Sequence, residues 1–377
     1  MCAAALRPAS AFKHPTRHVG LSADTKASPS SMNRRTSARL SDVARVAGVS
    51  LSTASRALTD PRLVHPDTRT RVDDAVRMLG YVAHGAARAL ASRRSRTIGA
   101  VVPTLDNPIF AHSTQALQRA LGEAGYTLLL ASHDYDAGTE LAVTRALVER
   151  GVDGLVLVGT DHAPELYQFL ARSGVPFELT WALDPDGHHH CIGFSNRLAS
   201  LRITQHLLSL GHREFAVVSG HTAHNDRARE RVAGVRDALA AHRLRLPAHR
   251  YVETAFSIAS GRLAVGALLD RDDAITAVVC GNDLLAFGAL LECAARGVGV
   301  PAQVSVAGFD DIELAAEVAP PLTTLHIPTS DIGRRAAERL LARLAGKRVP
   351  RAEEVPVELV LRASVGPVRK SARRKKG

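Results

Sequence analysis

From residue 97 onward the sequence alternates between short apolar runs and longer segments whose apolar residues recur at helical spacing. A strand that is apolar at nearly every position is buried on both faces, as in a parallel sheet covered by helices. Short buried strands that alternate with helices form βαβ units. The runs predicted as strands are 98–102, 127–130, 154–158, 176–180, 215–218, 277–280, 304–307 and 355–361. About 270 residues of this alternation predict an α/β unit that divides into two lobes.

The stretch 40–58, LSDVARVAGVSLSTASRAL, has the pattern of two short helices joined by a tight turn. Gly48 allows the left-handed turn that ends the first helix, and Ser50 is placed to cap the second. Ala54 and Ala57 lie on the side of the second helix that packs back against the first. The residues expected to contact DNA from this second helix are Ser50, Leu51, Ser52, Thr53, Ser55 and Arg56.

Positive charge is concentrated in the same part of the chain. Residues 33–96 contain 13 arginines and 5 aspartates, whereas residues 97–368 carry a net charge of −6. A basic head on an acidic body indicates that the head meets a polyanion, since arginine and lysine neutralise nucleic acid phosphates. The sequence therefore predicts a head that binds double-stranded DNA.

The core D-V-A-x-x-A-G-V-S-x-x-T-x-S-R occupies residues 42–56 without a gap. It resembles the DNA-binding head of the lactose/galactose repressor (LacI/GalR) family, and the resemblance continues to about residue 362. The resemblance implies an all-α helix-turn-helix head (39–80), a hinge (81–96) and a dimerising sensor (97–366). That sensor would be an α/β, two-lobed periplasmic-binding-protein-like (type I) domain with parallel sheets. The implied protein is a ligand-responsive repressor that binds a pseudo-palindromic operator as a homodimer, with its affinity modulated by a small sugar-type or sugar-acid effector.

Residues 81–92, YVAHGAARALAS, resemble the hinge of that family. The resemblance implies that Leu90 intercalates in the minor groove and that Arg88 lies near a phosphate. An apolar wedge of this kind kinks DNA at the cost of unstacking a base step. The sequence departs from the family's common pattern, since Ala83 and His84 stand where Pro-Asn is usual. The alternative is that Leu90 is simply part of a linker.

Polar and aromatic residues follow several of the expected strands, and ligands bind at the carboxyl edge of open parallel sheets. Sugars and related polyols require side chains that make paired directional hydrogen bonds, together with a flat apolar ring. The residues expected to bind the effector are Asn107, Phe110, Trp181, Arg231, Phe256, Asn282 and Asp310. Arg231, in the segment 225–234, stands at the family's ligand-gripping position. Arg227 and Arg229 are either further contacts or surface charges, and Phe256 is either a contact or core.

Other classes of protein fit the sequence less well. It has no P-loop, no G-x-S-x-G elbow and no G-x-G-x-x-G fingerprint, so we expect neither an enzyme nor a cofactor. The acidic residues at strand ends could perform acid/base chemistry, but they explain sugar binding more simply. A transport binding protein would need a signal peptide, which we do not expect at this N-terminus, and it would not need the basic head. A nucleoid packaging protein would not need a large acidic body. We expect no membrane segment, because no apolar run approaches the roughly 18 residues that a spanning helix needs.

The four cysteines, at positions 2, 191, 280 and 293, form no CxxC pair. We therefore expect no disulfide framework and no structural zinc, and a cytoplasmic location, with nucleoid association on DNA. The run His188–His189–His190–Cys191 could in principle bind a metal, but a polar loop explains it equally well.

The two ends of the chain lack the periodicity of a folded segment. Residues 1–38 are rich in Ala, Ser, Pro and Arg and are expected to be disordered, with Met32 as the true start of translation. Residues 367–377 form a basic tail, also expected to be disordered. This end carries none of the leucine heptads of a tetramerising helix, so we expect a dimer.

Overall fold

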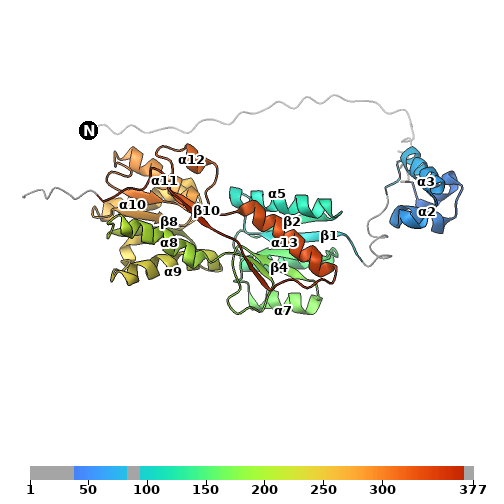
Figure 1. Ribbon diagram of the computed structural model, residues 1–377, viewed down its shortest axis with the longest axis horizontal. Helices are drawn as coiled ribbons and strands as arrows, with labels where there is room; N and C mark the ends of the chain where they lie inside the picture. Colours follow the sequence, from blue (N-terminus) through green and yellow to red (C-terminus); the bar gives the residue numbers. More distant parts are fainter. Residues whose placement is uncertain (1–37, 83–93, 369–377) are drawn as a thin grey trace, which may run out of the picture. The chain divides into compact units, whose positions relative to one another are not determined.

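The computed structural model describes residues 38–82 and 94–368 of the 377-residue chain. The chain divides into two compact units, Met1–Ala83 and His84–Gly377. In the first unit the described residues form a small helical head, and in the second they form an α/β body (Figure 1). The predicted hinge contacts Arg88 and Leu90 lie outside the described residues, as do the N-terminal extension up to residue 37 and the tail from residue 369.

The described part of the head consists of four helical segments around a small core. In chain order they are α1 (Leu40–Ala47), α2 (Leu51–Thr59), the 3-10 helix η1 (Pro61–Leu63) and α3 (Pro66–Leu79). Gly48 ends α1 with φ = 64°, in the left-handed region that a side chain disfavours. Ser50 caps α2, because its Oγ accepts a hydrogen bond of 3.1 Å from the Thr53 amide. Val43, Ala47 and Ala57 then pack against residues of α3, which confirms the predicted helix-turn-helix.

The first lobe of the body is a parallel sheet covered by helices on both faces, as the buried apolar runs predict. Its six strands lie in the order β11-β5-β4-β3-β1-β2. The strand bounds are β1 (Thr97–Val102), β2 (Thr127–Ser132), β3 (Gly154–Val158), β4 (Phe177–Thr180), β5 (Cys191–Gly193) and β11 (Ala352–Glu354). The helices of this lobe are α5 (Pro108–Glu123), α6 (Ala137–Glu149), α7 (Pro164–Ser173) and α13 (Thr329–Leu344).

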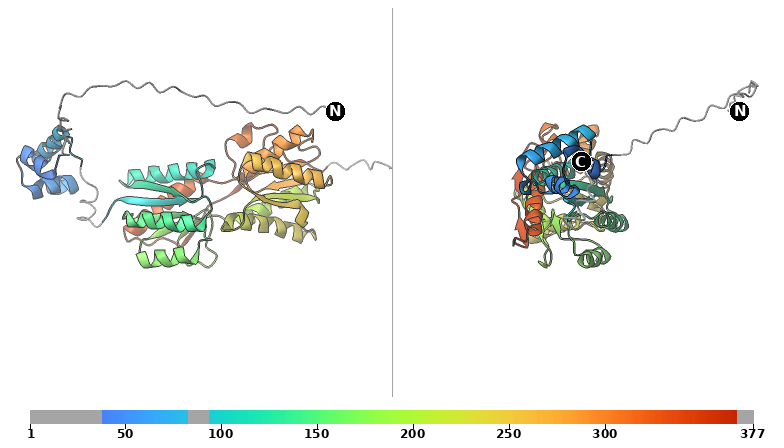
Figure 2. Two further views of the ribbon diagram at one scale, coloured as in Figure 1. Left: turned by 180° about the vertical axis from the view of Figure 1, so that it is seen from behind. Right: turned by 90° about the vertical axis from the view of Figure 1, so that its right-hand side faces the viewer.

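The second lobe has the same construction around a smaller parallel sheet (Figure 2). Its four strands lie in the order β7-β6-β8-β9. The strand bounds are β6 (Phe215–Gly220), β7 (Tyr251–Thr254), β8 (Ala277–Cys280) and β9 (Ser305–Ala307). The helical segments are α8 (Asn196–Ser209), α9 (Asp226–Ala241), η2 (Ala248–Arg250), α10 (Ile258–Arg271), α11 (Asp283–Ala295) and α12 (Leu314–Glu317).

The chain crosses between the lobes at three places: after β5, between β10 and α13, and between β11 and β12. Strands β10 (Thr324–His326) and β12 (Glu358–Val360) pair antiparallel where the last two crossings run side by side. This connectivity confirms the predicted two-lobed, type I periplasmic-binding-protein-like fold. Four short strands, β5, β7, β10 and β11, were not predicted. Strands β5, β10 and β11 have only three residues each, and the last two residues of β7 are polar, so none of the four carries a long apolar run.

Helix α13 returns to the first lobe and is fixed there by a buried ionic network. Arg339 places Nε 2.6 Å from Oε1 of Glu178 on β4 and Nη1 3.1 Å from Oε2 of Glu353. Arg343 lies 3.1 Å from the second oxygen of Glu178, which has no exposed surface. Burial raises the pKa of Glu178, while the two arginines oppose that shift. The network therefore ties a late segment of the chain to an early strand.

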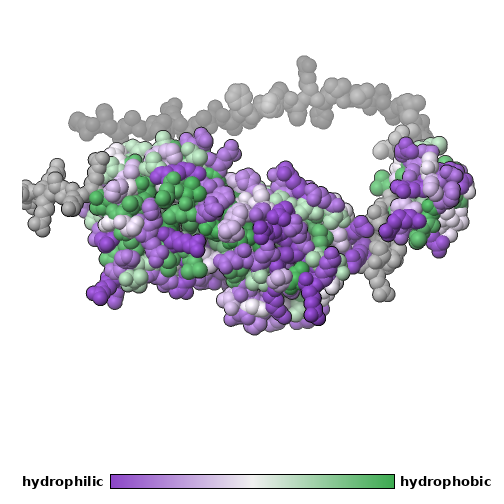
Figure 3. All heavy atoms as spheres, in the orientation of Figure 1, coloured by the Kyte–Doolittle hydropathy of each residue, from purple (hydrophilic) through white to green (hydrophobic). Residues whose placement is uncertain are grey.

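The surface of the body is uneven in polarity. Hydrophobic residues gather on the visible face of the second lobe, whereas the first lobe is mostly polar on that side (Figure 3). The exposed leucines of the second lobe include Leu263 on α10, 78% exposed, and Leu291 on α11, 50% exposed. Cys191, Cys280 and Cys293 are buried free thiols. Within the ranges that the structure describes, no helix is both long and apolar enough to span a bilayer.

Candidate functional site

Helix α2 presents a small polar face at its N-terminal end. Leu51 and Ser52 are exposed, and Leu51 has 54% of its surface accessible. The Ser50 hydroxyl lies 2.9 Å from Oγ of Ser52 and 2.8 Å from Oγ1 of Thr53, so these three side chains form one local network. Short hydroxyl side chains followed one turn later by the guanidinium of Arg56 suit contacts to base edges and phosphates.

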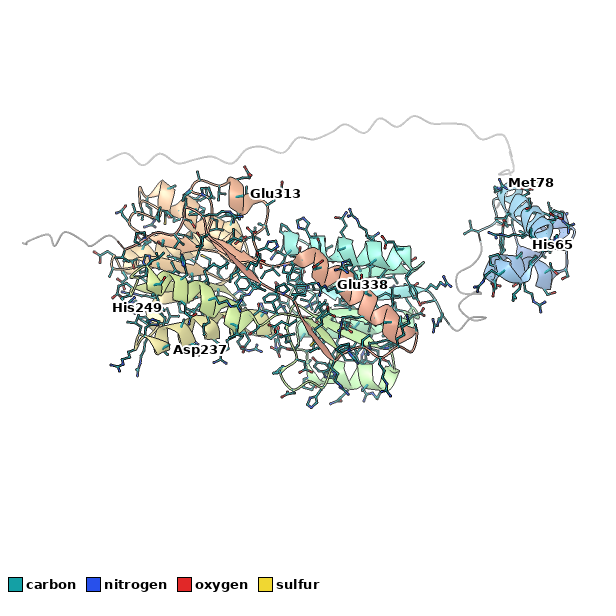
Figure 4. All side chains as sticks on the ribbon, viewed as in Figure 1. His65, Met78, Asp237, His249, Glu313 and Glu338 are labelled. Atoms are coloured by element: carbon teal, nitrogen blue, oxygen red, sulfur yellow. The ribbon has the colours of Figure 1, made fainter. Side chains whose placement is uncertain are left out.

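A second candidate site is a small cavity lined by residues of both lobes of the body, in the region where side chains crowd between the two lobes in Figure 4. It brings together six of the seven predicted effector residues, which come from distant parts of the chain. They are Asn107, Phe110, Arg231, Phe256, Asn282 and Asp310. The cavity has a volume of about 20 Å³, which is room for about one water molecule. The described conformation is therefore closed, and a sugar-sized molecule would enter when the lobes part.

The seventh predicted residue, Trp181, does not line this cavity. Trp181 has a positive φ of 71°, and its side chain is buried, with 1% of the residue exposed. The indole packs edge-on against the ring of Phe110, with the centroids 5.3 Å apart, and lines a separate small cavity inside the first lobe. Trp181 thus supports Phe110 from behind, because the turn after β4 directs it into the core instead of the cleft.

Arg231 is the most fully engaged residue of the cavity. Its Nε donates to Oδ1 of Asn196 at 2.8 Å, and its Nη1 donates to the carbonyl of Gly281 at 2.6 Å. The guanidinium carbon lies 3.6 Å from the centroid of the Phe309 ring. Nη1 also lies 3.7 Å from Oδ1 of Asp310, which is an ion pair without a hydrogen bond. Arg231 is thereby held rigidly with one edge toward the cavity.

Asp310 and Asn282 carry polar atoms that have no hydrogen-bond partner among the described residues. Oδ1 of Asp310 and Nδ2 of Asn282 are fully buried and make no hydrogen bond. Burial raises the pKa of Asp310 to about 7, although Arg231 opposes that shift. Asp310 also has φ = 120°, a strained conformation for a residue with a side chain. Unpaired buried groups cost free energy, so their presence in a cavity points to a ligand that pairs with them.

The two lobes are joined beside the cavity by a set of hydrogen bonds that we call the latch. The amide and hydroxyl of Thr160 both donate to Oδ2 of Asp226 at 2.8 Å. Arg227 donates through Nη1 to the carbonyl of Val158 at 3.1 Å, and Arg229 donates to Asp161 at 2.7 Å. Burial acts to raise the pKa of Asp226, but Arg227 and Thr160 outweigh it and lower that pKa. The latch closes the cleft through contacts within the protein.

The structure places Arg227 and Arg229, which the sequence analysis gave as either ligand contacts or surface charges, in different surroundings. Arg227 is 7% exposed and lines the cavity, whereas the side chain of Arg229 is 48% exposed. Arg227 and Arg231 are four residues apart on α9 and share a face, which is the signal that could have identified Arg227. At Gly159, which has φ = 93°, a Cβ would collide with the Arg227 guanidinium. The close approach of Arg227 to the first lobe therefore depends on glycine at this position.

Sequence reasoning missed two further lining residues that carry polar groups. Tyr135 follows β2 and reaches across the cleft, with its ring centroid 5.9 Å from that of Phe256. Asn225 caps α9, since its Oδ1 accepts a hydrogen bond of 3.2 Å from the Ala228 amide. The position of Asn225 between a strand and a helix is the same signal that identified Asn107 and Asn282.

Comparison with known proteins gives matches in both units. The family model described as bacterial regulatory proteins, lacI family, matches residues 39–84. The model described as a periplasmic binding protein-like domain matches residues 204–365. The chain is similar to the HTH-type transcriptional regulator GntR of Pseudomonas aeruginosa, with 36% identity over 336 residues. That alignment covers 88% of this chain and 97% of the relative.

Solved structures give the same result. A lac repressor dimer bound to operator and the anti-inducer ONPF is 26% identical, with a TM-score of 0.77, and the match covers 87% of this chain and 99% of that one. A complex of the transcriptional regulator CelR with cellobiose is 30% identical, with a TM-score of 0.65 and the same two coverages of 87% and 99%. Both similarities extend over the head and the body.

Proposed function

Since the chain belongs to the LacI family of bacterial regulatory proteins and is a DNA-binding transcriptional regulator, not an enzyme, we propose that it represses transcription under the control of a small molecule bound between its lobes. The observation that carries this proposal is the cavity itself. Both lobes contribute lining residues to it, and two of those residues, Asn282 and Asp310, have buried atoms without a hydrogen-bond partner among the described residues. A ligand that pairs with these atoms would favour one arrangement of the lobes over another, which is the requirement for a ligand to shift a conformational equilibrium.

We propose that the head reads a pseudo-palindromic operator through α2. In this proposal Arg56 and Ser52 reach base edges, while the Ser50, Leu51, Thr53 and Ser55 positions support or extend the contact. The polar face of α2 and the basic character of the head support it. Arg88 and Leu90 remain the proposed phosphate contact and minor-groove wedge of the hinge.

We propose a homodimer as the active species. Two heads related by a two-fold axis read the two halves of a palindrome, whereas one head makes too few contacts for useful specificity. The lac repressor to which the chain is similar is a dimer bound to operator. The exposed leucines on α10 and α11 provide an apolar surface that a partner subunit would cover.

We propose a sugar-type or sugar-acid effector, held by Asn107, Phe110, Arg231, Phe256, Asn282 and Asp310. The similar CelR structure contains cellobiose, and the cavity combines paired hydrogen-bonding groups with the flat rings of Phe110 and Phe256. Bacterial chromosomal DNA lies in the cytoplasm, so the protein works there, and we propose that it is associated with the nucleoid when bound to DNA.

The test is a footprint on the promoter region next to the gene, repeated with candidate metabolites. Arg56→Ala should weaken operator binding by about 1 to 3 kcal/mol if Arg56 makes a paired base contact. Arg271→Ala, which removes an exposed arginine at the end of α10, is the matched control and should bind operator like the wild type. Equal operator affinity of the Arg56 variant and the control, or a footprint that no sugar or sugar acid alters, would contradict the proposal.

A further inference from the structure

Three helices begin at the cavity. Asn107, Asn225 and Asn282 are the N-caps of α5, α9 and α11, and all three line it. These helices have 16, 16 and 13 residues, so each is long enough for its macrodipole to place a partial positive charge at its N-terminus. Three converging helix N-termini make the cavity favourable for negative charge.

Two buried guanidinium groups add to this positive field. Arg227 and Arg231 are each 7% exposed and both line the cavity. Arg227 makes its hydrogen bonds through Nη1, to Asp226 and to the Val158 carbonyl, and Arg231 makes its bonds through Nε and Nη1. Among the described residues, Nη2 of neither arginine has a hydrogen-bond partner. Each arginine therefore keeps N–H groups for a bound molecule.

The acidic groups nearby cancel only part of this charge. Among the described lining residues Asp310 is the one carboxylic acid, and with its pKa near 7 it is largely protonated in mildly acidic solution. Asp226 pairs with Arg227 at 2.8 Å and lies outside the lining. Tyr135, the remaining titratable group of the lining, is neutral because burial raises its pKa. Around neutral pH the cavity therefore keeps a partial positive field, from Arg231 beside an incompletely ionised Asp310 and from the three helix N-termini.

The two buried atoms without a hydrogen bond, on Asn282 and Asp310, require hydrogen-bonding groups from the bound molecule as well as charge. Nδ2 of Asn282 needs an acceptor, and Oδ1 of Asp310 needs a donor when ionised. A carboxylate alone offers no donor, and a neutral polyol offers no charge. We propose that the effector is a polyhydroxylated carboxylate, with its carboxylate toward Arg227 and the start of α9 and its hydroxyls toward Asn282 and Asp310. This inference rests on the proposed function, because it takes the cavity as the effector site, and it makes Arg227 a specificity-determining residue.

The experiment is calorimetric titration of the full-length protein with six-carbon aldonates (galactonate, mannonate, gluconate) and with the matching alditols. Each pair differs by a carboxylate in place of a CH₂OH group. At least one aldonate should bind about tenfold or more tightly than its alditol, since charge-assisted hydrogen bonds are about twice as strong as neutral ones. Glucose 6-phosphate is included as a phosphate anion, and its preferential binding would overturn the assignment of a carboxylate.

Two variants test the residues. Arg227→Gln should lower aldonate affinity about tenfold or more relative to alditol affinity, because weakening of the latch affects both ligands alike whereas the lost charge affects the aldonate alone. Asn282→Asp keeps a capping oxygen on α11 but adds negative charge, and should also weaken aldonate binding. Arg236→Gln is the control and should retain aldonate affinity, because Arg236 is exposed on α9 and belongs neither to the lining nor to the latch. Retained operator binding shows that each variant is folded.

The outcomes separate this inference from the proposed function. Equal binding of aldonates and alditols, no aldonate binding, or full aldonate affinity in Arg227→Gln would overturn the inference. If a neutral sugar then binds and changes the operator footprint, the proposed function stands without it. If aldonates bind as expected but operator affinity never changes, the ligand class is right and the proposed regulation is wrong.

Discussion

Replacing Asp310 with asparagine should make the body more stable, and increasingly so as the pH rises. Burial raises the pKa of this carboxyl from 3.8 to about 7 in the folded protein. At 1.36 kcal/mol for each pKa unit, ionising it in the folded state costs about 4 kcal/mol. A raised pKa means that the folded state binds this proton more tightly than the unfolded state, so stability is lost as the pH rises from about 4 to about 7. The amide of the Asp310→Asn variant is uncharged at any pH and escapes this loss.

The expected gain follows from the same two pKa values. At pH 5 the folded carboxyl is still protonated, and the variant should exceed the wild type by about 2 kcal/mol. At pH 8 the carboxyl is ionised in both states, and the gain should reach about 4 kcal/mol. Arg231 keeps its hydrogen bonds to Asn196 and Gly281 in the variant, so the arginine remains anchored.

The assay is urea denaturation at pH 5, 6, 7 and 8, followed by tryptophan fluorescence. Trp181 is the single tryptophan of the chain and is buried in the body, so its emission reports unfolding of that unit. Asp331→Asn is the control, because Asp331 is 46% exposed on α13 and pairs with Arg334 at the surface. A difference between variant and wild type that stays constant with pH, or a wild type that is the more stable at pH 8, would refute the reasoning.

Two further predictions concern folding of the head and of the first lobe. Ser50→Ala removes the cap of α2 and should destabilise that helix by about 1 kcal/mol. Hydrogen exchange in peptides from 50–60 should then be roughly fivefold faster. The control variant Ser55→Ala should leave that exchange nearly unchanged. Arg339→Ala leaves the buried Glu178 with Arg343 alone, and should lower the free energy of unfolding by about 3 to 5 kcal/mol in urea. An Arg339 variant as stable as the wild type would mean that the network contributes little.

The head was predictable almost residue by residue because its rules are local. Gly48 and Ser50 act on their own turn and helix, and both do in the structure what their residue types favour. The alternation of the body likewise located most strands. Strand β11, with the sequence AEE at the sheet edge, escaped because its pairing with β5 is set by tertiary contact instead of by its own hydrophobicity.

The cavity was predictable to the extent that its residues follow strands. Asn107, Asn282 and Asp310 lie in the loops that follow strands β1, β8 and β9, and the parallel topology brings them to one place. Trp181 also follows a strand, but its positive φ, which the sequence does not reveal, turns the side chain into the core. The latch between Thr160 and Asp226 escaped for a different reason, since two ordinary polar residues 66 positions apart become partners only through the way the lobes meet.

The latch also governs how fast an effector can arrive. With about 20 Å³ of free space, the closed cavity admits no effector larger than a water molecule, so the Thr160 and Arg229 bonds must break before each binding event. In stopped-flow mixing, the observed rate should therefore rise with effector concentration and then level off at the opening rate of the lobes. Thr160→Ala, which removes one of the two Thr160 bonds, would raise that plateau, so the sensitivity of the regulator to brief pulses of metabolite would depend on a residue outside the binding site.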